Sequence, residues 1–161
     1  MFRNLILVTA LLVVGLGATP IPVAAADKCE FATPGEAKEM AERAADYIGT
    51  AGLKDAFIAF MTPGSEFYDR DLYVFVLNFE GVLYASGAFP QAIGAVAIEA
   101  QDREGRHYVQ DMIAIAQTEG EGWVEYELVH PCTGEVTPKI SFVKRVGDFV
   151  VGVGAFGTVA T

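Results

Sequence analysis

The stretch GWVEYELVHPCTGEVTPKISFVKRV, residues 122–146, has the pattern of two β-strands joined by a turn. Side chains alternate over residues 122–129 and again over residues 137–146, as is typical of β-strands. Between the two runs stand the turn residues Pro131-Cys132-Thr133-Gly134. A third run, residues 149–155, follows Gly147-Asp148, a pair that favours a tight turn. Strands with such short connections predict a three-stranded antiparallel meander.

The first two strands differ in how well their inner faces can be predicted. In the first strand, Trp123 and two glutamates alternate with residues that we expect to face the interior, while Trp123 packs on the outer face. The inward set is Val124, Tyr126 and Leu128. In the second strand, Ile140 and Phe142 alternate with a set that is also partly apolar, namely Lys139, Ser141 and Val143. The alternation therefore leaves open which of these two sets faces the interior.

Upstream of the meander, the sequence predicts a strand pair and three helices. Residues 72–88 are typical of a hairpin around Glu80-Gly81, with both faces apolar enough to be covered. Thr33, Pro34 and Glu36 begin a long amphipathic helix with a capping box, and Gly49 ends it. Helical spacing of apolar residues predicts two more helices, over residues 53–61 and 106–120.

This order of elements predicts one α+β domain. Five strands joined mainly by short turns form an antiparallel sheet, and the helices before and between them must cover it. We therefore expect a PAS-like five-stranded antiparallel sheet with a long N-terminal helix, covering helices and a cavity between the layers. Such a cavity is a usual place for a small ligand.

The first 26 residues have the pattern of a secretory signal peptide. Arg3 precedes an apolar run over residues 5–17, and a stretch of small residues ends at Ala26, where we expect cleavage. The run is shorter than a membrane-spanning helix needs, although a retained anchor is the alternative interpretation. We therefore expect residues 27–161 to form a single domain in the periplasm or outside the cell.

Charge and motif content exclude several functions. The formal net charge of −10, without a basic stripe, disfavours nucleic acid as a partner. The sequence contains no nucleophile elbow, no phosphate-binding glycine loop and no zinc-protease motif. Its two histidines, His107 and His130, are too few for a three-histidine zinc site. We therefore expect neither catalysis nor a cofactor nor a metal.

The two cysteines, Cys29 and Cys132, lie far apart in a chain that we expect to be exported. Disulfides persist in such compartments, so we predict a bond that ties the N-terminal segment to the turn of the meander. The alternative is a reactive Cys132 thiol with His130 or His107 as its base, which would make the protein an enzyme.

Lys139 is the candidate that could hold an anion. In one interpretation it forms an exposed ion pair with Glu125 or Glu127 on the neighbouring strand, which contributes little. In the other, its ammonium lies at the wall of the cavity and binds a carboxylate. Hydrogen bonds could then come from three tyrosines and one histidine: Tyr73, Tyr84, Tyr126 and His107. The competing interpretation of these four is core packing for the tyrosines and a surface or capping position for the histidine.

Several motifs together resemble a known family. They are the Y-V-F-V strand with its N-x-x-G turn, G-W-V-x-Y, H-P-x-T-G, P-K-x-x-F-V-K and G-D-x-x-V-G-x-G, and they span residues 72–156. This combination resembles the single Cache domain of the second type, the extracytoplasmic sensor module of bacterial chemoreceptors and histidine kinases. The resemblance implies a PAS-like sheet and a pocket for a small organic acid such as acetate, propionate, pyruvate or lactate.

The resemblance also implies site residues. The aromatic residue of the first strand is Tyr73 or Phe75, the tyrosine of G-W-V-x-Y is Tyr126, and the lysine and following aromatic are Lys139 and Phe142. Phe142 departs from the family, which often has tyrosine there, and Cys132 within the turn is a second departure.

Two functions follow as expectations. The first is an exported domain that binds a small organic acid and passes its state to a membrane-bound receptor or transporter, because the chain ends at Thr161 soon after the last strand. The second is an accessory or structural module that docks onto another protein, with its cavity filled by residues such as Phe75, Phe79 and Phe142. A second copy of the chain, bound through the long N-terminal helix, is a further candidate partner.

Overall fold

The computed structural model describes residues 29–157 of the chain. The expected signal peptide and its cleavage after Ala26 lie outside the described residues. The elements follow in this order: α1 (Pro34–Ala51), α2 (Leu53–Met61), β1 (Tyr68–Asp69), β2 (Leu72–Asn78), β3 (Leu83–Ser86), η1 (Pro90–Ala92), α3 (Tyr108–Thr118), β4 (Glu121–Val129), β5 (Val136–Val146) and β6 (Phe149–Phe156).

The predicted α+β class and antiparallel sheet are confirmed. The strands follow the order β1-β2-β6-β5-β4, and β3 also pairs with β2. The meander of β4, β5 and β6 forms the larger part of the sheet, as its short turns predict. The sheet has six strands instead of five because the two-residue β1 also pairs with β2. A strand that short has no alternation by which the sequence could reveal it.

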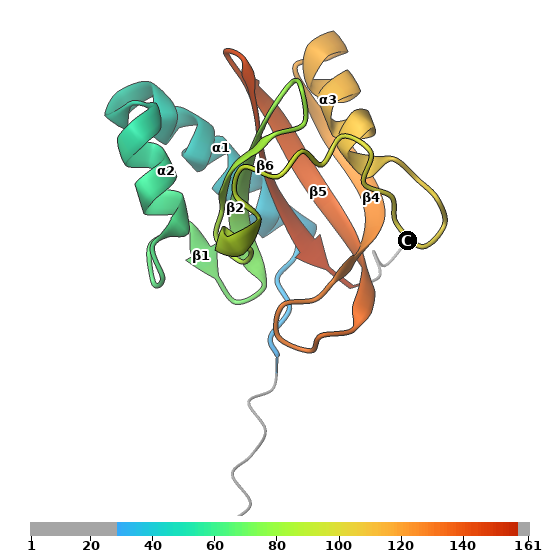
Figure 1. The fold of residues 1–161 in the computed structure, drawn as a ribbon. Coiled ribbons are helices and arrows are strands. Elements are labelled where there is room, and N and C mark those ends of the chain that lie inside the picture. Colours follow the sequence, from blue (N-terminus) through green and yellow to red (C-terminus); the bar gives the residue numbers. More distant parts are fainter. Residues whose placement is uncertain (1–28, 158–161) are drawn as a thin grey trace, which may run out of the picture.

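Helices cover both faces of the sheet, which gives the domain three layers. Figure 1 shows α1 and α2 on one side of the strands and α3 on the other. Because successive strand residues point to opposite faces, Val74 and Val76 of β2 pack with α1, whereas Phe75 and Leu77 pack with α3. Each face of β2 is therefore buried, and its apolar run has no polar alternation.

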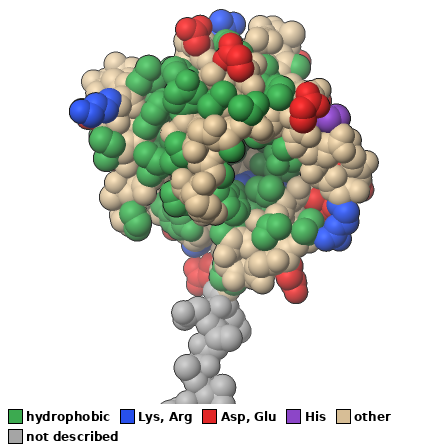
Figure 2. Space-filling view, in the orientation of Figure 1, with side chains coloured by type: hydrophobic (Ala, Val, Ile, Leu, Met, Phe, Trp, Pro, Cys, Tyr) green, Lys and Arg blue, Asp and Glu red, His purple; other side chains and the backbone are tan. Residues whose placement is uncertain are grey.

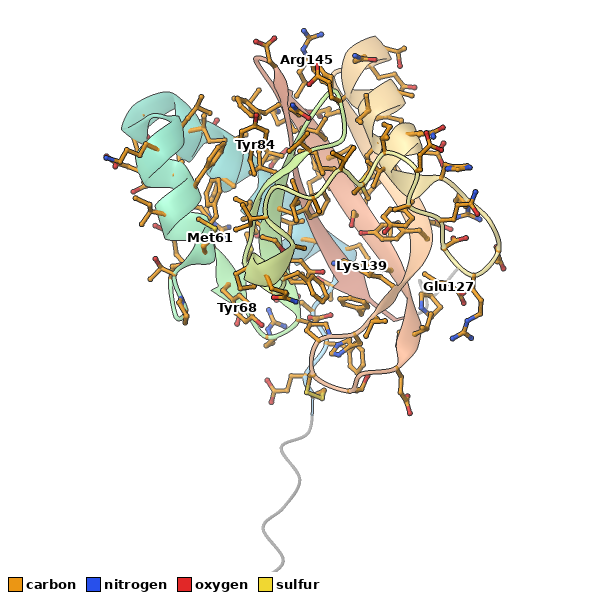
Figure 3. The ribbon with its side chains drawn as sticks, viewed as in Figure 1. Met61, Tyr68, Tyr84, Glu127, Lys139 and Arg145 are labelled. Carbon is orange, nitrogen blue, oxygen red and sulfur yellow. A yellow bond between two sulfur atoms is a disulfide. The ribbon has the colours of Figure 1, made fainter. Side chains whose placement is uncertain are left out.

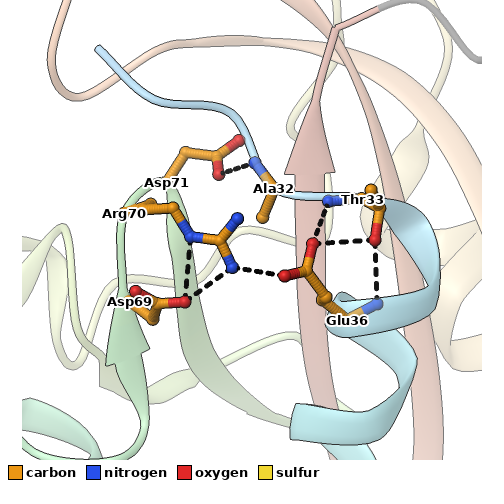
Figure 4. Close-up of polar contacts among 6 residues, drawn as sticks. All are labelled: Ala32, Thr33, Glu36, Asp69, Arg70 and Asp71. Atoms are coloured by element: carbon orange, nitrogen blue, oxygen red, sulfur yellow. Dashed lines mark hydrogen bonds and ion pairs between the residues drawn. The ribbon is translucent and has the colours of Figure 1, made fainter. Parts of the chain in front are cut away.

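Helix α1 begins with the predicted capping box, which the structure confirms (Figure 4). The Thr33 backbone N–H donates to the Glu36 carboxylate over 2.8 Å, and the Glu36 N–H donates to the Thr33 hydroxyl over 3.3 Å. Arg70 reaches the same carboxylate over 2.6 Å and also pairs with Asp69. The hydrogen bond from Arg70, followed by those from Thr33, lowers the pKa of Glu36 to about 2. This network joins the start of α1 to the turn between β1 and β2.

Asp71 holds the N-terminal segment against the end of the sheet. Its buried carboxylate accepts the Ala32 N–H over 2.7 Å and the Phe156 N–H over 3.0 Å (Figure 4 shows the first of these). One side chain thus satisfies backbone donors from two segments that are 124 positions apart in the chain.

The predicted disulfide is confirmed: Cys29 bonds to Cys132, with Cα atoms 6.1 Å apart. The bond closes a loop with a sequence separation of 103, for which the chain-entropy model gives about 5 kcal/mol. His130 is buried beneath this turn, and its Nδ1 accepts the Cys132 N–H over 3.1 Å. A bonded Cys132 has no free thiol, so the nucleophile that the enzyme interpretation requires is missing.

Candidate ligand-binding site

A cavity of about 310 Å³ lies between the sheet and α3, bounded also by the segment after β3. Its lining is mainly aromatic and aliphatic and includes Tyr73, Phe75, Leu83, Phe89, Met112 and Tyr126. Figure 2 shows a hollow among hydrophobic side chains on this face, with part of a basic side chain in its depth. In Figure 3, which has the same orientation, Lys139 lies at this place.

The register of the sheet decides which side of β5 faces this cavity. Lys139 pairs with Tyr126 of β4, and Ser141 pairs with Val124, so these four side chains share one face. Phe142 pairs with Trp123 on the opposite face. The alternative of an exposed ion pair for Lys139 is wrong, because the residue is only 2 % exposed and no Glu bonds to it among residues 29–157.

The Lys139 ammonium is surrounded by aromatic groups. Its Nζ donates to the Tyr73 hydroxyl over 2.7 Å, and it lies 3.9 Å from the Tyr73 ring centroid and 4.4 Å from that of Phe156. Cation–π contacts of this kind partly offset the loss of water. Burial nevertheless lowers the pKa of Lys139 to about 7, against a smaller opposite effect of Asp71. The site thus stabilises the charge of Lys139 incompletely.

Lys139 has unused hydrogen-bonding capacity. An ammonium carries three N–H groups, and among residues 29–157 one of them has a hydrogen-bond partner, the Tyr73 hydroxyl. Asp71, the acid that acts on Lys139 electrostatically, accepts backbone N–H groups from Ala32 and Phe156 instead. A buried ammonium in this state can bind an anion through two further N–H groups.

Two tyrosines place hydroxyl groups near the ammonium. Burial raises the pKa values of Tyr73 and Tyr126, so both stay protonated at neutral pH. Because the Tyr73 hydroxyl accepts from Lys139, its own hydrogen remains available for a further acceptor. The Tyr126 hydroxyl hydrogen-bonds Ser141 over 3.0 Å, and its ring stacks on that of Tyr108 at 4.5 Å.

A second cavity of about 330 Å³ includes both Lys139 and Tyr126 in its lining. Its lining includes the acidic residues Asp102, Glu104 and Glu127. Since carboxylates repel anions, the first cavity is the better approach for an anionic ligand. Tyr126, which lines both cavities, forms part of the wall between them.

Two glycines of β6 make room for the site. A Cβ atom at Gly152 would overlap the Phe75 ring, and one at Gly154 would overlap the Ser141 hydroxyl and the Lys139 side chain. The V-G-x-G pattern at the end of the chain is therefore explained by side chains that cross β6 from its neighbours.

The structure brings together four of the seven predicted binding residues and separates the other three. Tyr73, Phe75 and Tyr126 line the first cavity, and Lys139 lies behind its wall, where it contacts the Tyr73 hydroxyl. Tyr84 is 40 % exposed and contacts Phe57 and Phe149, on the side of α2.

Phe142 and His107 also lie elsewhere. Phe142 packs in the core beneath α1, and Lys38 of that helix lies 4.8 Å from its ring. His107 precedes α3 and contacts Gln101 and Gln110 beside the cavity without lining it. Both faces of the sheet are covered, so alternation alone could not assign Tyr84 and Phe142 to one of them.

Three further residues contribute to the site without having been singled out from the sequence. Tyr108 and Met112 line the cavity from α3, four positions apart on one helical stripe, which was a usable signal. Phe89 lines it from the irregular segment before η1, where no periodicity marks an inward residue.

Among residues 29–157, no group of three His, Cys, Asp or Glu side chains is placed to hold a metal ion. Within the same range, no helix is both long and apolar enough to cross a bilayer.

Several solved structures share the fold of this chain. A methyl-accepting chemotaxis protein from Vibrio parahaemolyticus RIMD 2210633 superimposes with a TM-score of 0.67 at 16% identity, over 76% of this chain and 86% of that one. A Cache chemosensory domain, described for its carboxylic acid recognition, superimposes with a TM-score of 0.61 at 17% identity, over 77% of this chain and 88% of that one. The periplasmic sensor domain of a chemotaxis protein superimposes with a TM-score of 0.59 at 22% identity, over 77% of this chain and 90% of that one.

Sequence comparison gives a more specific result. No curated protein matches the chain. The family model described as single Cache domain 2 matches residues 32–157, which is nearly the whole of the described structure. The chain therefore belongs to the single Cache domain 2 family.

Proposed function

We propose that this protein is an exported sensor domain that binds a monocarboxylate at Lys139 and catalyses no reaction. The observation that carries the proposal is a buried ammonium in contact with Tyr73, a wall residue of the open cavity, with two N–H groups that have no hydrogen-bond partner among residues 29–157. A carboxylate supplies the negative charge and the acceptor oxygens that would pair with these N–H groups. Carboxylic acid recognition by a Cache chemosensory domain of the same fold is consistent with this.

The carboxylate would enter through the hollow of Figure 2 and meet Lys139 and the Tyr73 hydroxyl at its base. The surrounding aromatic rings exclude water, which strengthens a charge–charge interaction. Binding is thus local, and the overall negative charge of the chain opposes it only weakly at physiological salt.

Localisation and partners follow from the same proposal. Residues 1–26 direct export, and the bound state is read by a membrane-bound receptor or transporter. A homodimer through α1 is a further proposed arrangement. The cavity supports ligand binding over a purely structural role, because Phe142, which was expected to help fill it, packs on the opposite face.

The test is a thermal-shift titration of three proteins with a panel of monocarboxylates at millimolar concentration. The proteins are the unchanged chain, Lys139→Met, and the matched control Lys54→Met at an exposed position of α2. A ligand that binds only the native state stabilises it by RT ln(1 + [L]/Kd), about 2.7 kcal/mol at one hundred times Kd. We expect at least one acid to raise the Tm of the unchanged chain and of Lys54→Met, and not that of Lys139→Met. Equal shifts in all three, or none for any acid, would contradict the proposal.

A further inference from the structure

The cavity beside Lys139 is much larger than the smallest carboxylates need. Its volume is about 310 Å³. For comparison, an apolar protein cavity of about 150 Å³ holds one benzene molecule. Acetate or propionate would therefore leave most of the apolar wall without a contact, and the binding energy of that surface would be lost.

The cavity has a polar end and an apolar end. Tyr73 and Leu77 both line it from the same face of β2, and four strand residues span about 13 Å. Lys139 contacts Tyr73 at one end. Ala97 also lines the cavity, and its N–H donates to the carbonyl of Gly81, beyond the other end of β2. The apolar end thus lies away from the ammonium.

The lining of the apolar part offers no partner for a second polar group. It includes Leu77, Leu83, Val109 and Met112, whose side chains have no strong hydrogen-bonding atom. The hydroxyl groups of Ser86 and Tyr108 lie nearer the polar end, because Ser86 pairs with Phe75 and the Tyr108 ring stacks on Tyr126. A second carboxylate placed here would be buried without compensation, which is strongly unfavourable.

We infer that the ligand is a monocarboxylate with a large apolar part, an aromatic ring or a chain of about six to nine carbon atoms, rather than a two- or three-carbon acid. Its carboxylate binds at Lys139 and Tyr73, and its apolar part extends along β2 toward Leu77 and Ala97. This inference rests on the proposed carboxylate binding and names the class of acid.

Calorimetric titration of the unchanged chain with acetate, butanoate, hexanoate and 3-phenylpropanoate tests the inference. Each added methylene group that finds room should strengthen binding about fourfold, as transfer of one CH₂ from water does. Hexanedioate, which matches hexanoate in length but carries a second carboxylate, should bind at least about tenfold more weakly. Acetate binding more tightly than hexanoate and 3-phenylpropanoate would overturn the inference while leaving carboxylate binding intact. Absence of binding by every acid would instead contradict the proposed function itself.

A pair of variants tests where the apolar part lies. Ala97→Leu should shorten the far end of the cavity and weaken 3-phenylpropanoate binding about tenfold, with little effect on butanoate. Ala95→Leu is the matched control, because Ala95 is exposed and does not line the cavity. Unchanged affinity for 3-phenylpropanoate in Ala97→Leu would overturn the assigned direction. If Ala97→Leu fails to fold, the acid series on the unchanged chain still decides the size class.

Discussion

At the scale of single residues, Lys139 is a charge that the fold buries without an ion pair among residues 29–157. Such a group destabilises the empty domain, because removing an ammonium from water is unfavourable unless it is paired. The Tyr73 hydroxyl and the rings of Tyr73 and Phe156 offset part of this. A buried charge that lowers stability in the absence of ligand is typical of binding sites, where the ligand provides the missing partner.

The burial of Lys139 predicts how the stability of the empty domain depends on pH. Its pKa is about 7 in the folded domain and 10.5 by its usual value, so the unfolded chain binds more protons between these limits. Lys139 therefore lowers the free energy of unfolding by its full amount below about pH 7. This destabilisation decreases as pH rises toward 10.5.

Denaturant unfolding without ligand, from about pH 7 to about pH 9.5, measures this dependence. We expect Lys139→Met to be more stable than the unchanged chain by up to a few kcal/mol at about pH 7, and the difference to shrink with rising pH. Lys54→Met, at an exposed position, should show no such trend. A difference in stability that stays constant over this pH range would show that folding does not lower the pKa of Lys139.

At the scale of elements, the close approach of β5 and β6 sets the path of the Lys139 side chain. Gly154 pairs with Ser141, and a Cβ there would overlap both Ser141 and Lys139. We expect Gly154→Ala to displace the ammonium, weaken acid binding at least about tenfold and destabilise the domain by about 1–3 kcal/mol.

Calorimetry and denaturant unfolding check this variant against Gly49→Ala. Gly49 lies within α1, and its added methyl group would meet no atom within 4 Å. That control should bind acids normally and gain slightly in stability, because alanine favours a helix more than glycine does. Acid binding by Gly154→Ala at unchanged affinity would show that the path of Lys139 over Gly154 is unimportant.

Strand positions could be predicted from the sequence better than the face on which each side chain lies. Alternation and turn residues predicted β4, β5 and β6 to within about two residues at each end, and the inward set of β4 as well. The inward face of β5 could not be predicted, since Phe142 and Val143 are both buried, on opposite faces. The pairing of Lys139 with Tyr126 decides it, and register between strands is a property of the folded sheet.

At the scale of the whole molecule, both sides of the sheet carry an apolar cluster, but they are packed differently. The side under α1 and α2 forms a continuous core, whereas the side under α3 contains the cavity. The sequence predicted that helices cover the sheet and that a cavity lies between the layers, but not on which side, because the cavity depends on Phe89 and Ala97 in an irregular segment. The disulfide and Asp71 fix the N-terminal segment at the end of the sheet where Phe156 contacts Lys139.

The most direct measurement is an NMR pH titration of Lys139 in the whole domain, free and saturated with 3-phenylpropanoate. Lysine labelled with ¹³C at Cε reports the protonation of each side chain, and the spectrum of Lys139→Met identifies the signal. We expect a pKa near 7 in the free domain and a clear rise on binding, because a carboxylate beside the ammonium stabilises its charged form. If the acid binds and the pKa of Lys139 does not change, the carboxylate lies elsewhere and the proposed site is wrong.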